Sequence, residues 1–370
     1  MTGLKSQDTV WKLAQTNPVT LPSVSAVVVC YFTGSPLKDC LFSLLADPQV
    51  DEIVIVNNGN KPRDLGFLNR FADAQKQRVK LITGHGNVGF AAGANLGARA
   101  SRGERILFIN PDAILRRGSI AAFEDAAIGL KEPWIVGGRV FDEHGKEQRG
   151  GRRRILRMTS AFVTFTGLSL FEPLHSMFED FNRLRDNQPD GPVPMPVVSG
   201  ALMYMSRQGF ERLQGFDEDY FLHVEDIDIC RRAGEVLGGD VAYTPLAGAL
   251  HYGGTSDVPS WKVEWQKAKG LGLYFRKHAS SRREKTLAFI MTPAFTCILL
   301  CRLGLRAAPG VLFRALLSLF GVQRGRPGSA QGAGVSIVSS RFFGLSRKRF
   351  LLQRSGSTTT ATSSEGSLLE

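Results

Sequence analysis

The feature that most constrains the fold is the alternation of two sequence patterns between residues 25 and 141. Continuous apolar, β-branched runs are typical of strands that are buried on both faces of a parallel sheet. Such runs occur at 25–32, 51–60, 79–84, 105–113 and 134–141. Segments with helical or small-residue patterns separate them, at 37–47, 64–77, 90–101 and 119–129. Strands and helices that alternate at this spacing predict an α/β fold with a doubly wound, mainly parallel sheet.

Four of the predicted strands end in a polar or glycine-rich tip, at 31–33, 57–59, 84–89 and 110–112. Ligands of open parallel sheets bind at the carboxyl ends of the strands. The four tips together therefore favour a nucleotide-binding cleft, and ordinary turn chemistry is the alternative.

The third tip, Gly-His-Gly-Asn-Val-Gly at 84–89, matches the pattern of a dinucleotide-binding loop between a strand and a helix. That fingerprint belongs to the first strand of such a fold and is followed by an acid at the end of the next strand. Here the motif follows the third strand, and the acid at the right distance, Glu104, precedes its strand. We therefore interpret the glycines as positions where the backbone can approach a phosphate or a base closely.

A second informative stretch is GFDEDYFLHVEDIDICRR at 215–232, where carboxylates flank aromatic residues. Asp and Glu suit the first turn of a helix because of the helix dipole, so a helix is expected to start near Asp226. The alternative is that one of these carboxylates is a general base in a pocket lined by aromatic side chains. Asp217 and Asp228 are expected to hold the segment in place.

Five arginines fall within the nine residues 149–157, beside two glycines. A solvated loop is one interpretation of such a run. The other is a mobile basic loop that folds over a diphosphate or an acceptor phosphate. The candidate contacts are Arg152, Arg153 and Arg154.

The chain carries a formal net charge of +12, and its basic residues are concentrated toward the C-terminus. Residues 271–354 contain fifteen Lys and Arg but one acid, Glu284, so the rest of the chain has a charge near −2. Such a block indicates nucleic acid, an anionic membrane or a phosphate-bearing substrate as a partner.

The segment 286–300 has no charged residue, but its 15 residues are few for a membrane span. Arginines alternate with Leu and Phe in the residues that follow. We expect 281–322 to form a basic amphipathic helical region at the membrane interface, or else a helical pair packed on the domain. The tail at 323–370 is rich in Gly, Ser, Arg and Thr and is expected to be disordered.

The N-terminal residues lack the apolar stretch of a secretory signal, so 1–22 are interpreted as an arm. Five cysteines without a pairing pattern predict a reduced, cytosolic protein. Cys297 and Cys301 lie in an apolar run without a nearby His, and are interpreted as core or membrane-facing thiols.

Seven segments resemble, in the same order, the inverting family 2 glycosyltransferases of the GT-A fold, and most closely their bacterial rhamnosyltransferase-like branch. The segments are VVVCYF, IVIVNNGN, GHGNVGFAAGANLGA, ILFINPDA, VVSGALMYMSR, GFDEDYFLHVEDIDICRRA and HYGGTS. They cover roughly residues 24–280. The resemblance therefore implies a GT-A glycosyltransferase domain at 23–280, followed by the membrane-associating extension.

The resemblance also implies roles for particular residues. Asp112 stands where the family has its DxD-type motif and would hold a divalent metal, Mg²⁺ or Mn²⁺, on the donor diphosphate. His251 stands where some members have a further metal ligand. Asp226, beside Glu225, stands where the family has the base that deprotonates the acceptor. The implied contacts of the donor nucleotide are Tyr31, Asn57, Asn58, Asn87, Gly89, Asn95, Asn110 and Asp112.

Two positions depart from the family pattern. Asn57 stands where an Asp usually reads the base, which leaves the base specificity open. Asn110 replaces the first acid of a strict DxD motif, so one charged ligand remains. Metal binding is therefore expected to be weaker or substrate-dependent.

The implied reaction is a single displacement with inversion at the anomeric carbon. Asp226 accepts the proton of the acceptor hydroxyl, whose oxygen attacks from the face opposite the nucleotide. Asp112 must reach the donor diphosphate, so the two carboxylates are expected to face one cleft from opposite sides.

The leading hypothesis is transfer of rhamnose from dTDP-rhamnose to a bacterial surface-glycan or lipid-linked acceptor. The basic C-terminal region predicts that the enzyme works in the cytoplasm at the inner face of the cell membrane. A sugar-phosphate nucleotidyltransferase is a second class, which would release pyrophosphate. A basic nucleic-acid-binding protein is a third, although the sequence has no recognisable motif for it.

Overall fold

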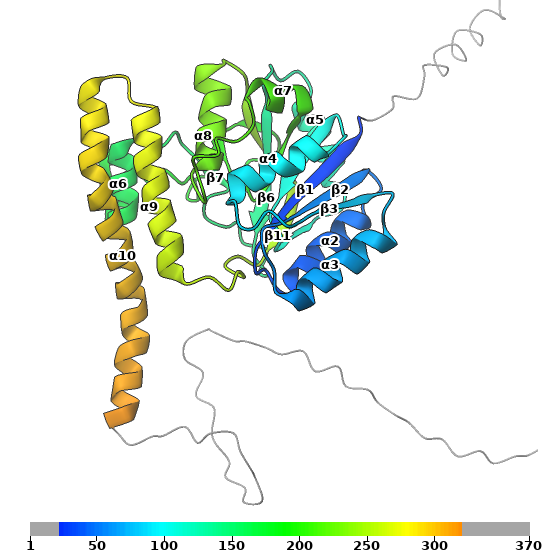
Figure 1. Ribbon diagram of the computed structural model, residues 1–370. Helices are drawn as coiled ribbons and strands as arrows, with labels where there is room; N and C mark the ends of the chain where they lie inside the picture. Colours follow the sequence, from blue (N-terminus) through cyan, green and yellow to red (C-terminus); the bar gives the residue numbers. More distant parts are fainter. Residues whose placement is uncertain (1–21, 320–370) are drawn as a thin grey trace, which may run out of the picture. The chain divides into compact units, whose positions relative to one another are not determined.

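The computed structural model describes residues 22–319, with side chains up to Gly304 (Figure 1). The chain divides into two units, 1–315 and 316–370, and the description concerns the first. The expected arm at 1–22, apart from its last residue, and the expected disordered tail at 323–370 lie outside the described residues. The proposed domain boundaries stay predictions.

Four strands of the main sheet are parallel and follow the predicted pattern. β1 (Val24–Cys30) pairs with β2 (Glu52–Asn57) and with β4 (Arg105–Ile109), and β2 pairs with β3 (Val79–Ile82). Both β1 and β2 are buried along their whole length, as their continuous apolar runs predict.

Helices connect these strands and cover both faces of the sheet. α2 (Pro36–Leu45) and α3 (Pro62–Ala74) lie side by side on one face, and α4 (Phe90–Ala100) lies on the other (Figure 1). α5 (Ser119–Ala127) packs against the far half of the sheet. This is the doubly wound arrangement that the alternation of patterns predicts.

The rest of the sheet is mixed, and the order of its main path is β3-β2-β1-β4-β10-β6-β11-β5. β10 (Leu202–Ser206) is antiparallel to β4 and to β6 (Ile135–Phe141), whereas β11 (Val241–His251) is parallel to β6. β11 is one strand with a bulge between Thr244 and Gly248. β5 (Ala113–Leu115) has three residues, too few to show a period in the sequence.

Aromatic side chains join residues 215–232, which we call the acidic segment, to the sheet. Phe108 of β4 lies against Phe210 of α7 (Arg207–Arg212) and against Phe216, with ring centroids 5.4 and 5.0 Å apart. Phe216 is buried. Phe216 therefore anchors the acidic segment in the core, and this packing fixes the backbone that carries its carboxylates.

Two residues of the arginine-rich stretch, Arg152 and Arg153, form a buried strand, so these two are not part of a solvated or mobile loop. Their role as phosphate or acceptor contacts stays a prediction. β7 (Arg152–Arg153) pairs with β9 (Val197–Val198) in a small antiparallel sheet. Arg152 is 4% exposed, and its guanidinium donates to the Glu147 carboxylate at 3.0 and 2.9 Å. Buried guanidinium groups need acids as partners, and a nearby acid in the sequence supplies one here. The third candidate, Arg154, pairs with Glu179 at 2.7 Å.

Two long helices complete the described part of the chain. α9 (Ser260–Lys277) is followed by α10 (Arg282–Leu319), which is one continuous helix. The expected helical pair within 281–322 is therefore wrong, because no turn-forming residue separates the apolar run from the arginines that follow it. Thr292 and Thr296 donate their hydroxyls to carbonyls one turn earlier, on either side of Pro293.

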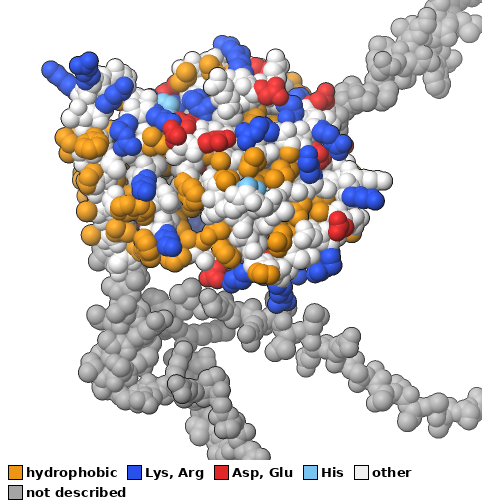
Figure 2. Space-filling view, in the orientation of Figure 1, with side chains coloured by type: hydrophobic (Ala, Val, Ile, Leu, Met, Phe, Trp, Pro, Cys, Tyr) orange, Lys and Arg blue, Asp and Glu red, His pale blue; other side chains and the backbone are white. Residues whose placement is uncertain are grey.

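The first part of α10, Arg282–Gly304, has a mean hydropathy of 1.8. By length and composition it could cross a membrane, and it is the only such helix in the described residues. Its apolar side chains are largely outside the core, and Phe289 is 71% exposed. Figure 2 shows hydrophobic side chains along the side formed by α9 and α10, with basic side chains at the end where the two helices join.

Candidate active site

The two predicted metal ligands meet at the edge of the sheet. β5 begins directly after Asp112 and pairs with β11 so that Ala113 lies opposite His251. This register places Asp112 Oδ1 3.1 Å from His251 Nε2. Thr255 donates to Asp112 Oδ2 at 2.9 Å, and the Asn110 amide nitrogen lies 3.2 Å from His251 Nε2.

Gln148 fixes the orientation of the His251 ring. Its Nε2 donates to the His251 carbonyl at 2.6 Å, and its Oε1 lies 2.7 Å from His251 Nδ1. Because an amide oxygen only accepts, Nδ1 carries a proton. In the neutral ring, the lone pair of Nε2 then faces Asp112 and Asn110.

This set of atoms fits a hard divalent cation. Asp112 Oδ1 and His251 Nε2 are 3.1 Å apart, close to the separation of neighbouring ligands in an octahedral site with bonds of about 2.1 Å. An outer partner for the second ring nitrogen is usual for a metal-binding His. No cluster of three or more His, Cys, Asp or Glu that could hold a metal occurs in residues 22–319. A cation here would take its other ligands from water and the donor diphosphate.

Replacing Gln148 by Met is expected to weaken Mn²⁺ binding by about 10- to 100-fold, since the His251 ring loses the partner that sets its tautomer. Titration of the protein with Mn²⁺ in the presence of a nucleoside diphosphate measures the effect. Lys146→Met, an exposed position in the same turn, is the matched control. Equal affinity for Gln148→Met and the wild type would show that Gln148 does not orient a metal ligand.

The end of β2 carries Asn57, whose side chain is bonded within the protein. Its Nδ2 donates to Thr83 at 3.0 Å, and its Oδ1 accepts from the backbone of Gly59 and of Asn60. Asn57 therefore shapes the turn at this strand end. Tyr31, at the end of β1, is half-buried beside Gly59.

The glycine motif at 84–89 joins this strand end to the acidic segment. Asn58 Nδ2 donates to Gly89 O at 2.8 Å, and Asn87 Oδ1 accepts from Gly89 N. Gly89 has a φ of 88°, and a Cβ there would lie 2.5 Å from Phe221 O, so no other residue fits. Phe90 N donates to the same Phe221 oxygen at 2.8 Å. The last glycine of the motif thus permits a close approach between two parts of the chain.

Asn95 lies further along the same connection, buried within α4. Its amide nitrogen donates to Phe216 O and to the Glu218 carboxylate, at 2.8 and 2.9 Å. Its oxygen accepts from Phe216 N at 2.9 Å. The contacts of Asn95 are therefore with the acidic segment, and they position that segment against α4.

Asp226, the predicted base, lies in the first turn of α8 (Glu225–Arg231), so the helix begins where the sequence predicts. Arg153 Nη2 donates to Asp226 Oδ2 at 2.5 Å, and Gly200 N donates to the same oxygen at 3.1 Å. Burial alone would raise the pKa of Asp226, but the charge and hydrogen bond of Arg153 outweigh it and hold this pKa below its usual value. Asp226 is therefore ionised at neutral pH and able to accept a proton.

Glu225 behaves differently from its neighbour. It is buried, and burial together with repulsion from Asp226 raises its pKa to about 8. His223 has its pKa lowered to about 4 by burial and by the nearby Lys267 charge.

The backbone before α8 is strained. His223 and Val224 both have a positive φ, 67° and 76°, and this conformation is especially unfavourable for the β-branched Val224. Such strain persists at sites where the surrounding structure fixes it, and functional sites are enriched in it.

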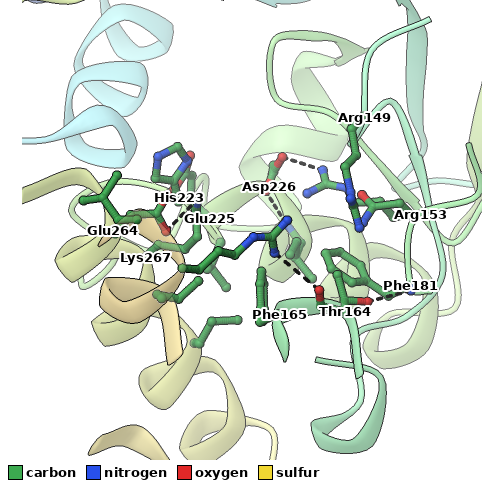
Figure 3. A pocket seen from close by; sticks show the side chains of 17 residues that line it. Arg149, Arg153, Thr164, Phe165, Phe181, His223, Glu225, Asp226, Glu264 and Lys267 are labelled. Carbon is green, nitrogen blue, oxygen red and sulfur yellow. Dashed lines mark hydrogen bonds and ion pairs between the residues drawn. The ribbon is translucent and has the colours of Figure 1, made fainter. Parts of the chain in front are cut away.

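A cavity of about 290 Å³ opens beside Asp226 (Figure 3). In Figure 3, Arg149 and Arg153 lie on one side of Asp226, and His223, Glu264 and Lys267 lie on the side of α9. Residues of α6 (Met158–Thr166) and α10 complete the walls. Neither predicted metal ligand lines this cavity.

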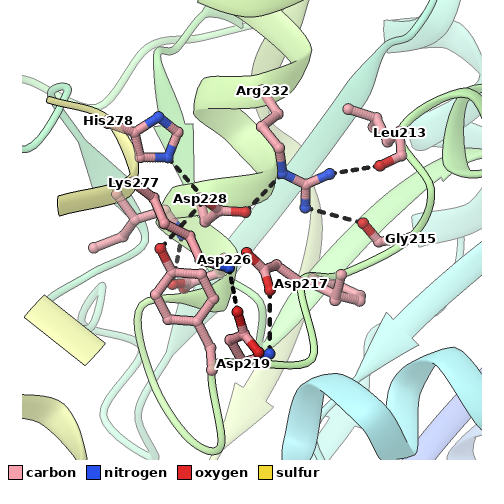
Figure 4. A network of polar contacts seen from close by, with 12 residues as sticks. Leu213, Gly215, Asp217, Asp219, Asp226, Asp228, Arg232, Lys277 and His278 are labelled. Atoms are coloured by element: carbon pink, nitrogen blue, oxygen red, sulfur yellow. Dashed lines mark hydrogen bonds and ion pairs between the residues drawn. The ribbon is translucent and has the colours of Figure 1, made fainter. Parts of the chain in front are cut away.

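A second set of polar contacts holds the acidic segment from behind (Figure 4). Asp228 is buried and accepts from Arg232 Nε at 2.7 Å and lies 2.8 Å from His278 Nε2. Lys277 pairs with both Asp217 and Asp219. Asp217 and Asp228 therefore hold the segment in place, as the sequence predicts.

The family profile described as "Glycosyl transferase family 2" matches residues 25–212, which is half of the chain. The chain belongs to this family. Family membership makes the protein a glycosyltransferase. It is therefore neither of the other two classes considered from the sequence, a nucleotidyltransferase or a nucleic-acid-binding protein.

Two relatives of this family 2 glycosyltransferase are rhamnosyltransferases by name. The N-acetylglucosaminyl-diphospho-decaprenol L-rhamnosyltransferase of Mycobacterium tuberculosis is 27% identical over 238 residues, which is 61% of this chain and 75% of that protein. Rhamnosyltransferase WbbL of Escherichia coli K12 is 25% identical over 239 residues, or 62% and 83% of the two chains.

Among solved structures, GalNAc-T7 with UDP, GalNAc and Mn²⁺ matches with a TM-score of 0.51 at 14% identity. The match spans 70% of this chain and about half, 51%, of that chain. This likeness shows the GT-A fold of the family 2 domain.

Sequence reasoning missed three residues that lie in or beside the candidate site of this family 2 enzyme. Gln148 lies in a stretch that reads as a loop, and its partner His251 is 103 positions away. His223 and Lys267 line the cavity at Asp226. In the sequence, nothing distinguishes His223 from the residues around it, and Lys267 has the pattern of a surface residue on an amphipathic helix. The His223–Glu225 spacing beside an aromatic run is the signal that could have drawn attention to His223.

In this glycosyltransferase, replacing Asp228 by Ala is expected to lower the free energy of unfolding by about 3–5 kcal/mol, because the partly buried Arg232 and His278 both lose the buried carboxylate that they share. Urea denaturation at pH 7 measures the loss. Asp219→Ala is the control. The Asp219 side chain is 69% exposed in its ion pair with Lys277, so its loss should lower the free energy of unfolding by less than about 1 kcal/mol.

The contribution of Asp228 also depends on pH with a definite sign. Burial would raise the pKa of Asp228, but the contacts with His278 and Arg232 lower it below its unfolded value of about 3.9. The stabilisation is therefore fully present above that value and is lost as pH falls through the folded pKa. A stability difference from Asp228→Ala that stayed constant from pH 7 to pH 3 would contradict this account.

Proposed function

We propose that this glycosyltransferase moves a sugar from a nucleotide-diphosphate donor to the hydroxyl of a lipid-linked or surface-glycan acceptor, with inversion. The favoured donor is dTDP-rhamnose, because two relatives are named rhamnosyltransferases. The observation that carries the proposal is the separation of roles between the Asp112–His251 pair and Asp226. The Asp112–His251 pair is suited to binding a cation on a diphosphate, and Asp226 is suited to accepting a proton.

At the donor end, Asp112 and His251 would hold a divalent metal, Mn²⁺ or Mg²⁺. When bound, the metal neutralises the charge that develops on the departing diphosphate. Thr255 and Gln148 orient the two ligands through hydrogen bonds of 2.9 and 2.7 Å. The turns at Asn57 and Asn58 and the glycine motif supply backbone groups toward the nucleotide.

At the acceptor end, Asp226 takes the proton of the attacking hydroxyl. Arg153 and the Gly200 N–H hold one carboxylate oxygen, Oδ2, at 2.5 and 3.1 Å. Oδ1 accepts from the neighbouring backbone N–H of Ile227, at 2.8 Å, and it is the atom assigned to the proton. Arg153 therefore orients the base and keeps it ionised until the acceptor arrives.

Contacts join the strand end at Asn58 to the acidic segment. Asn58 at the donor side binds Gly89, and Gly89 and Phe90 meet Phe221. Phe221 lies five residues before Asp226 on the acidic segment. In the proposed arrangement the donor sugar lies between the metal pair and the cavity at Asp226.

The C-terminal helix supports work at a membrane surface. The Arg282–Gly304 part of α10 is apolar and largely exposed, and its first turn carries exposed Arg282, Arg283 and Lys285. Basic residues beside an apolar helix favour an anionic lipid surface. We therefore place the enzyme at the cytoplasmic face of the cell membrane.

The proposal is tested by incubating the protein with Mn²⁺, radiolabelled dTDP-rhamnose and a bacterial membrane extract. We expect label in the lipid-linked fraction, release of the nucleoside diphosphate, and loss of both on chelation of the metal. Transfer from other nucleotide sugars but not from dTDP-rhamnose would overturn the donor assignment.

A further inference from the structure

The cavity beside Asp226 contains more polar groups than proton transfer needs. Among the described residues, three of those that line it have a buried side-chain atom without a hydrogen-bond partner: Arg153 Nε, His223 Nε2 and Glu225 Oε2. Buried polar atoms in folded proteins are almost always bonded, and exceptions call for a ligand or water. Their concentration in one cavity indicates that a polar ligand completes the site.

The charge of the cavity indicates the sign of that ligand. Its lining includes four cations, Arg149, Arg153, Lys267 and Arg302. The acids that face them are Asp226 and Glu264, with Asp180 behind Arg149. Glu225 is largely uncharged at neutral pH, since its pKa is raised to about 8. The balance is positive, and the site is suited to an anion.

The cations are held in position rather than left mobile. Lys267 lies 3.2 Å from Glu264 one turn earlier on α9, and Arg302 donates to Thr164 O of α6 at 3.4 Å. Lys267 and Arg302 belong to α9 and α10, whereas Asp226 belongs to α8. Two of the four cations, Lys267 and Arg302, therefore stand on the wall of the cavity that the two long helices form.

Apolar surface continues from that same wall. Leu271 of α9 and Leu299 and Leu303 of α10 line the cavity, and Phe165 of α6 lines it as well. Nearer the start of α10, apolar side chains are exposed, with Phe289 at 71%. An anionic ligand with a long apolar part would find partners for both parts along one path.

We propose that the cavity binds the diphosphate of a polyprenyl-diphosphate acceptor, with Lys267 and Arg302 as the phosphate contacts. The acceptor sugar then lies toward Asp226, and the polyprenyl chain leaves along α10. The inference rests on the proposed transfer to a lipid-linked acceptor and adds the residues that recognise its diphosphate.

The test is a binding measurement that does not require transfer. Farnesyl diphosphate, farnesol and inorganic pyrophosphate are titrated separately into the detergent-solubilised full-length protein by calorimetry. Farnesyl diphosphate is expected to bind, farnesol not to bind, and pyrophosphate to bind more weakly. Lys267→Met and Arg302→Met are each expected to weaken farnesyl diphosphate binding by at least about tenfold, since each removes a charge-assisted hydrogen bond.

Lys269→Met is the matched control, because Lys269 is exposed on the same helix and does not line the cavity. It should bind farnesyl diphosphate like the wild type. Equal affinity of Lys267→Met and wild type, or equal binding of farnesol and farnesyl diphosphate, would overturn the proposal. Pyrophosphate binding as tightly as farnesyl diphosphate would mean that the site takes free diphosphate and not a lipid. None of these outcomes depends on whether sugar transfer from dTDP-rhamnose is observed.

Discussion

Replacing Asp226 by Asn is expected to reduce sugar transfer by about 10²–10⁴-fold, the usual contribution of a general base. The substitution keeps the shape of the side chain and removes the charge that accepts the proton. The affinity for the donor should change little, because Asp226 is assigned to the acceptor. Initial rates of transfer and calorimetric binding of the donor nucleotide measure the two quantities.

The neighbouring acids provide matched controls for this result. Glu225→Gln should have a much smaller effect, since Glu225 is largely protonated at neutral pH and Gln resembles the neutral acid. Asp219→Asn changes an exposed acid of the same segment and should leave the rate unaffected. If Glu225→Gln were the more damaging substitution, the roles of the two carboxylates would have to be exchanged.

Replacing Asp112 by Asn is expected to lower metal-dependent transfer by at least about 100-fold, because a bound metal supplies several kcal/mol of charge stabilisation. Asn110 already lacks a charge, so Asp112 is the charged ligand of this strand end, and Asn would leave two neutral amides beside His251. The measurement is the rate of transfer as a function of Mn²⁺ concentration, together with the free Mn²⁺ signal in electron paramagnetic resonance.

Thr255→Val is the control for Asp112→Asn. It removes the hydrogen bond to Asp112 Oδ2 and keeps the carboxylate, so the expected loss is about tenfold or less. Transfer by Asp112→Asn at the wild-type rate and the same Mn²⁺ concentration would show that the pair of Asp112 and His251 does not serve a metal.

The parallel half of the fold could be predicted from the sequence, whereas the roles of the site residues stay predictions. Buried parallel strands such as β1 and β2 leave long apolar runs, and their polar ends stand out against them. Asp112 and His251 were both assigned through the resemblance to the family. Their meeting depends on the pairing of β5 with β11, which a three-residue strand does not reveal.

The arginine cluster shows why the rest could not be predicted. A run of arginines reads as solvent-exposed, but Arg152 is buried against Glu147 and Arg153 is held by Asp226. The second partner lies 73 positions away, and a charge pattern in one sequence does not show which distant acid will neutralise it. Similarly, the cavity at Asp226 is built from α6, α8, α9 and α10, whose packing no local pattern encodes.

The most direct test of the central claim is the stereochemistry of the product. Wild-type protein is supplied with a nucleotide sugar of known anomeric configuration, and the configuration of the transferred residue is read from its one-bond C1–H1 coupling by NMR. A single displacement assisted by Asp226 predicts complete inversion. Retention of the donor configuration would contradict the assignment of Asp226 as the base of a direct displacement.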